Sequence, residues 1–94
     1  NYALAEEIYR SVISFAPDAP KAWNNLGVVL NYQNNKEEAE AAFRKAIELA
    51  PDFPNPWYNL RDIMLSRGDK AGAEEARQHG AAVIHFADQW TTDD

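Results

Sequence analysis

Carboxylates and imidazoles are the residues of this sequence that could carry acid–base or metal chemistry. Glu6, Glu40 and Glu74 recur at intervals of 34 residues, and paired carboxylates can serve as general acid and general base. They fall away from the apolar stripe of their segments, which is typical of a solvated helix face. His79 and His85 are six residues apart, so on a helix they point in different directions and do not form a metal site by themselves. We therefore predict no catalytic residue, no metal ligand and no cofactor.

Charge and composition exclude further classes of function. The 94 residues carry a net charge of -6 and include no cysteine, which removes disulfides, thiolate zinc sites and cysteine nucleophiles. Because the few cations are spread along an acidic chain, we predict neither nucleic acid nor an anionic membrane as a partner. The sequence shows no signal peptide and no apolar run near the roughly 18 residues of a membrane span. We expect a cytoplasmic protein.

The segments that position these residues repeat along the chain. Residues 17–23 (PDAPKAW) and 51–57 (PDFPNPW) are nearly alike at an offset of 34, and the same offset carries Leu26 onto Leu60. A period of this length with Trp-x-x-Leu-Gly, then Ala-x-x-x-Phe, then Pro resembles the tetratricopeptide repeat. In the middle repeat the motif residues are Trp23, Leu26, Gly27, Ala39, Phe43, Ala46 and Pro51.

The resemblance covers essentially the whole chain and implies an all-α fold. In this family, helical hairpins stack as a right-handed superhelix, an α-solenoid, and this chain holds about two and a half repeats. We predict a single domain over residues 1–94. Its parts are the second helix of a partial repeat (1–17), a full repeat (18–51), a divergent repeat (52–86) and a C-terminal tail (87–94).

Local signals predict where the helices begin and end. Pro20 suits the first turn of a helix, and Asn34 and Gly68 can take the left-handed conformation that ends one. Asn35 and Asp69 can then cap the helices that follow. The predicted helices span residues 2–15, 20–33, 36–49, 54–67 and 70–88.

The aromatic residues at the repeat positions are predicted to pack in the core rather than to bind a ligand. Trp23 and Trp57 occupy the signature packing position of the family, and Tyr9 and Phe43 share a second repeat position. Gly27 has no side chain, so the neighbouring helix can approach it closely.

Both ends of the chain depart from the repeat pattern. Arg61 stands at the position of the close-packing glycine, Arg77 at that of the aromatic, and His85 at that of the helix-ending proline. These changes predict a longer last helix with a polar outer face, as terminal repeats require. The tail, with Ile84, Phe86 and Trp90, either folds back onto the array or docks on another chain.

The first segment has apolar residues on two sides. The apolar residues of this segment would need packing partners on both faces of its helix: Ala5, Ile8, Tyr9, Val12 and Ile13. Apolar surface that stays uncovered favours association with another chain. We therefore predict that either an upstream repeat or a second copy of the chain covers this helix, the second copy forming a homodimer through the terminal helices.

The resemblance also implies a binding surface, because the first helix of each family repeat lines the concave groove. Asn25 and Asn59 each lie two residues after their tryptophan, which resembles the asparagine ladder of the O-linked N-acetylglucosamine transferase repeats. An amide donates and accepts, so it can hold a peptide backbone; alternatively, asparagine is simply common at this family position. The predicted groove residues are Asn24, Asn25, Val28, Asn31, Tyr58, Asn59, Asp62 and Leu65.

Three functions remain open. The first is a scaffold that binds a peptide or an extended protein segment in the groove, and the second is a self-assembly module. The third is a substrate-recruiting arm of a larger enzyme such as a glycosyltransferase or sulfotransferase. An acidic tail as the ligand is disfavoured, because Asn55 and Asn59 stand where the chaperone-binding repeats of the family carry basic residues.

Overall fold

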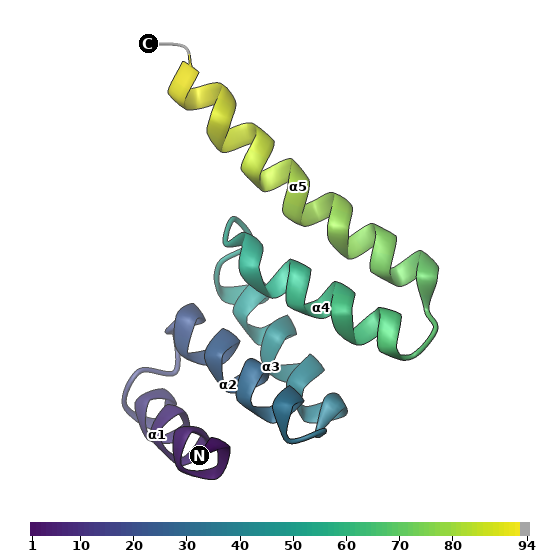
Figure 1. The fold of residues 1–94 in the computed structure, drawn as a ribbon. Helices are drawn as coiled ribbons and strands as arrows, with labels where there is room; N and C mark the ends of the chain where they lie inside the picture. The colour runs from purple at the N-terminus through teal and green to yellow at the C-terminus, as the bar shows by residue number, and fades with distance from the viewer. Residues whose placement is uncertain (93–94) are drawn as a thin grey trace. The chain divides into compact units, whose positions relative to one another are not determined.

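The computed structural model describes the backbone of residues 1–92 and the side chains of residues 1–86. Over this part the chain has five helices and no strand (Figure 1), which confirms the predicted all-α helical repeat. The helices are α1 (Tyr2–Phe15), α2 (Pro20–Tyr32), α3 (Lys36–Leu49), α4 (Pro54–Ser66) and α5 (Lys70–Thr92). The chain divides into two compact units, the first Asn1–Pro51 and the second beginning at Asp52.

In the first unit, α2 packs against both α1 and α3. Gly27 on α2 lies directly against the ring of Phe43 on α3. A Cβ atom at Gly27 would stand 2.5 Å from Cε1 of Phe43, so only glycine allows the two helices to approach this far. The buried apolar side chains of the unit are Ala22, Leu26, Val29, Leu30, Ala39, Ala42, Phe43 and Ala46.

The α2–α3 and α4–α5 turns have the same backbone construction. Asn34 and Gly68, which are 34 residues apart, are the described residues with positive φ, at 66° and 79°. In each turn the next residue donates its N–H to a carbonyl five positions back at 2.9 Å, from Asn35 to Leu30 and from Asp69 to Met64. These bonds satisfy the last carbonyls of the helix, so both predicted helix ends are confirmed.

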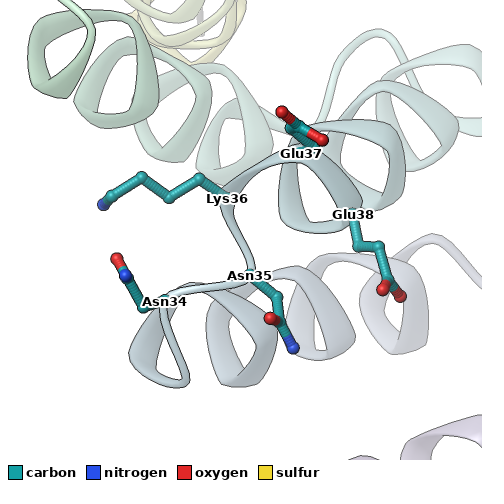
Figure 2. A pocket seen from close by; sticks show the side chains of 5 residues that line it. All are labelled: Asn34, Asn35, Lys36, Glu37 and Glu38. Atoms are coloured by element: carbon teal, nitrogen blue, oxygen red, sulfur yellow. The ribbon is translucent and has the colours of Figure 1, made fainter.

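The two predicted N-caps have different outcomes. Asp69 caps α5 as expected, since its Oδ1 accepts a hydrogen bond from the N–H of Gly72 at 2.9 Å. Asn35 stands at the N-cap of α3, but its side chain makes no capping hydrogen bond. Asn35 instead lines a cavity over the turn together with its neighbours Asn34, Lys36, Glu37 and Glu38 (Figure 2). The side-chain cap predicted for Asn35 is therefore wrong.

In the second unit, α4 packs against α5. The close approach has moved from the glycine position, now Arg61, to Gly80 on α5, where a Cβ would lie 3.1 Å from Cζ of Tyr58. Trp57 and His79 stack with ring centroids 4.5 Å apart. The predicted polar outer face is present, because Arg77 is exposed and pairs with Glu74 through Nη2.

Helix α5 continues to Thr92, four residues beyond the predicted end, and extends past the N-terminal end of α4 in Figure 1. The proline that ends the corresponding helix of the full repeat, Pro51, is replaced here by His85, which keeps its backbone N–H for the helix. Ile84 and Phe86 are exposed. The side chain of Trp90, predicted to fold back or to dock, lies outside the described side chains.

Four aromatic residues were predicted to pack in the core, and only one of them is completely buried. Phe43 is 1% exposed, whereas Tyr9, Trp23 and Trp57 are half-buried. The indole N–H of Trp23 donates to the carbonyl of Pro17 at 2.8 Å, which ties the ring to the turn before α2.

Helix α1 has no fully buried residue. Ala5, Tyr9 and Ile13 are half-buried, as expected for the face turned to α2. A second apolar stripe is exposed along the helix: Leu4, Ile8, Val12 and Phe15. The prediction of two apolar faces is confirmed, and one of them is uncovered.

Candidate functional site

The predicted groove residues of α2 do not all share one face. Asn25 is exposed and Val28 is half-buried, and three residues along a helix place them on the same side. Lys21 and Tyr32 are exposed on this side too. Asn31 is half-buried, and its Oδ1 accepts a hydrogen bond from Nζ of Lys36 at 3.3 Å. The accessible face of α2 is therefore built around Asn25 and Val28.

Asn24 does not belong to this accessible face. It is 5% exposed, whereas a groove contact was expected to be open to solvent. Successive helical residues differ by about 100° around the axis, so Asn24 lies a quarter-turn away from Asn25. That rotation turns its side chain into the packed side of α2, and the expectation of an exposed Asn24 is wrong.

On α4, Asp62 and Leu65 are exposed, while Tyr58 and Asn59 are half-buried. The guanidinium of Arg61 lies 5.4 Å from the ring centroid of Tyr58 and also binds Oδ1 of Asp62 at 3.0 Å. The acidic and aromatic residues of this face are thus joined through one cation. The sequence suggested no such link, because Arg61 was noted only as a missing glycine.

The periodic glutamates are engaged in ion pairs, each with an arginine on its own helix. The distances are 2.8 Å for Glu6–Arg10, 2.8 Å for Glu40–Arg44 and 2.6 Å for Glu74–Arg77. These pairs lie on solvated helix faces, which agrees with the structural role expected for the glutamates.

Two of these pairs shift the titration of their carboxylates. Hydrogen bonds from Arg10 and then Gln33 lower the pKa of Glu6, and a hydrogen bond from Arg77 lowers the pKa of Glu74. A carboxylate with a lowered folded-state pKa stabilises the fold above its unfolded-state pKa, and this contribution is lost as the pH falls through the folded-state value. Both carboxylates are ionised at neutral pH, so neither is poised as a general acid.

Two hollows occur in the first unit. One, of about 440 Å³, is formed by the consecutive residues 34–38 at the α2–α3 turn (Figure 2). The other, of about 340 Å³, is lined by α1, α2 and α3 and has Trp23, Leu26 and Leu30 of α2 in its wall. Sequence reasoning missed this second cavity, because it treated Trp23 as a core residue without a free edge.

Within the described residues, no group of three or more histidines, aspartates or glutamates is placed to hold a metal ion. The same part of the chain contains no helix that is long and apolar enough to cross a membrane.

Comparisons with known proteins identify the repeat. The family model of the tetratricopeptide repeat matches residues 20–53, the segment that contains α2 and α3. The curated proteins give no match. Solved structures of similar fold are numerous, and three of them define the level of similarity.

The crystal structure of MamA matches 94% of this chain with a TM-score of 0.90 and 16% identity. The CopN-Scc3 complex matches 87% with a TM-score of 0.80 and 23% identity. The type III secretion translocator chaperone SycD of Yersinia enterocolitica, described as an alternative dimer, matches 97% with a TM-score of 0.85 and 15% identity.

The match covers 52% of the MamA chain, 48% of the matched chain of the CopN-Scc3 complex and 72% of SycD. This chain thus spans about half the length of the first two, and identities this low show the fold alone. The family model matches one complete helical hairpin, and the second hairpin repeats its turn at an offset of 34 residues. Residues 20–53 therefore match a tetratricopeptide repeat, and the chain as a whole shares the fold of the solved structures it resembles.

Proposed function

We propose that the chain is a protein-interaction scaffold that binds an extended protein segment through the first helix of each repeat, α2 and α4. In the tetratricopeptide-repeat family, the first helix of each repeat lines the concave groove. The observation that carries the proposal is the accessible face of α2, where the exposed amide of Asn25 stands beside Val28. An amide next to an apolar side chain can bond a peptide backbone and cover its aliphatic side chains.

Helix α4 supports the same proposal with a different composition. Asn59 occupies the repeat position of Asn25, and Leu65 adds an exposed apolar side chain. Arg61 and Asp62 neutralise each other in an ion pair. The occupant we propose is therefore bound through its backbone and apolar side chains rather than through a strong charge of one sign.

We predict that Asn25→Ala combined with Asn59→Ala weakens binding of extended peptides by about tenfold, because each lost hydrogen bond contributes about 0.5–1.5 kcal/mol. The measurement is the affinity of peptides selected on the wild-type chain from an array of extended segments. Thermal unfolding should change little for Asn25→Ala, since Asn25 is exposed, and it is measured separately for Asn59→Ala, since Asn59 is half-buried. Gln78→Ala removes an exposed amide from α5 and is the matched control. Equal affinity in the double variant and the control would remove the asparagines from the site.

Self-assembly is the second candidate function, and the uncovered stripe of α1 favours it. Phe15 is 91% exposed, and Leu4, Ile8 and Val12 continue the stripe. Burying each such side chain contributes about 1.5–3 kcal/mol before the entropy of association is subtracted. Four residues on one helix are enough for a weak dimer.

We predict a monomer–dimer equilibrium for the wild-type chain, measured by light scattering over a range of concentrations. Ile8→Glu places a charge in the stripe and should shift the equilibrium towards monomer. Ser14→Glu adds the same charge to an exposed position of α1 outside the stripe and should leave the equilibrium unchanged. A strictly monomeric wild-type chain at high concentration would contradict the assembly function.

A further inference from the structure

The cavity lined by Trp23 lies on the opposite side of α2 from the face used in the proposed function. Trp23 and Leu30 are about half a turn around the helix from Asn25, at 3.6 residues per turn. The cavity has a volume of about 340 Å³ and belongs entirely to the first unit. It is therefore a separate surface, and its role does not depend on whether Asn25 binds a peptide.

The walls of the cavity are apolar and held in place. Leu26 and Leu30 are almost completely buried at its floor. The hydrogen bond from the indole of Trp23 to Pro17 fixes the ring. Helices α1 and α3 both pack on α2, and an ion pair of 3.1 Å between Arg10 of α1 and Glu38 of α3 joins them. A cavity with fixed walls loses little entropy when it takes up a side chain.

The lining carries two basic residues and one acidic residue, and both cations also pair with carboxylates beside the lining. Arg10, Glu38 and Lys45 are the charged residues of the lining. Arg10 is satisfied by Glu6 at 2.8 Å and by Glu38. Lys45 has a longer ion pair of 3.5 Å, with an exposed Glu48. Its ammonium group is thus the rim cation that an incoming carboxylate can share.

We propose that this cavity is a second binding site, which takes one large apolar side chain of a partner protein together with a carboxylate beside it. The volume lies near the lower end of ligand pockets, about 300–1,000 Å³, which suits one aromatic or aliphatic side chain rather than a whole peptide. The apolar group packs on Trp23 and the leucines, and the carboxylate meets Lys45. An anchor in a small apolar pocket with a charged rim is the arrangement of an interface hot spot.

The probe for this site is a blocked pentapeptide, Gly-Asp-Phe-Asp-Gly, titrated into the isotope-labelled chain. The reporter is the indole N–H resonance of Trp23, assigned by its loss in Trp23→Phe. We expect saturable shifts with a Kd in about the millimolar range. Two matched peptides separate the contributions: replacing the phenylalanine with alanine should abolish binding, and replacing both aspartates with asparagine should weaken it several-fold.

Two variants test whether the cavity itself is occupied. Ala41 is exposed and lines the cavity, so Ala41→Phe should fill the mouth and lower the affinity by at least about tenfold. Ala82→Phe makes the same change at an exposed position of α5 and should have no effect. Lys45→Gln should remove the preference for the aspartate peptide over its asparagine counterpart, and Lys70→Gln should preserve it.

Three results would overturn the proposal. Shifts confined to Asn25 and Val28 would assign the peptide to the other face of α2. Unchanged binding in Ala41→Phe would show that the cavity is not entered. Loss of self-association in Ala41→Phe, without any response to the peptide, would identify the occupant as a second copy of the chain.

Discussion

Replacing Phe43 with alanine is expected to lower the free energy of unfolding by about 3–5 kcal/mol, the range for a buried aromatic side chain. Phe43 is 1% exposed and is among the largest completely buried side chains. Its ring rests against the bare backbone of Gly27, so no side chain there can move in to fill the space. The total stability of a domain is about 5–15 kcal/mol, so this one change should leave the chain largely unfolded or close to it.

Urea denaturation followed by circular dichroism gives the value directly. Phe15→Ala is the matched control, because the same side chain is removed from a position that is 91% exposed. The control should change stability by less than about 0.5 kcal/mol, as surface substitutions do, when it is measured below the concentration of any dimer. Similar losses for both variants would show that the packing of Phe43 does not determine stability.

Much of the fold could be predicted from the sequence because the signals that end each helix are local. Pro20 and Pro54 mark the first turns of α2 and α4, and a proline there loses no hydrogen bond. Asn34 and Gly68 take the positive φ that ends the preceding helices. The end of α5 was harder to predict, because His85 does not end a helix and no proline or glycine follows it in the sequence.

The candidate site was less predictable, because exposure depends on what packs against a helix. Asn24 and Asn25 are neighbours of the same type, and only the tertiary structure separates the buried one from the exposed one. The cavity beside Trp23 depends on α1 and α3 leaving one edge of α2 open. A helical period marks an apolar stripe, but it does not indicate how completely neighbouring helices cover that stripe.

In the divergent repeat, the loss of the glycine on the first helix is compensated by a glycine on the second helix, which the sequence alone did not indicate. Arg61 at the glycine position suggested that close packing was lost. In the structure, Gly80 restores it from the opposite helix, against Tyr58. The glycine that allows the two helices to approach lies on the first helix of the full repeat and on the second helix of the divergent repeat. Comparison of a single repeat position does not show this change. The comparison of Gly27 with Gly80 leads to a quantitative test.

Gly27→Ala is expected to destabilise the chain although alanine favours a helix over glycine by about 1 kcal/mol. The added Cβ would lie 2.5–2.9 Å from three ring atoms of Phe43. The ring is buried and cannot swing into solvent, so the overpacking cost of about 1–3 kcal/mol exceeds the gain in helix propensity. Gly27→Val should cost more, because its two methyl groups enter the same space. Gly80→Ala should be milder, since its Cβ would stand at 3.1 Å from Tyr58.

A double-mutant cycle identifies the clash as the cause. Phe43→Leu removes Cε1 and Cζ, two of the three ring atoms nearest to Gly27, and leaves a shorter side chain that can turn away. Adding Gly27→Ala in that background should therefore be neutral or stabilising. The coupling energy between the two substitutions, from the unfolding free energies of the four proteins, should reach about 1–3 kcal/mol for residues in direct contact. Additive effects would mean that the alanine acts elsewhere, and that α2 and α3 do not need a bare backbone at Gly27 to pack.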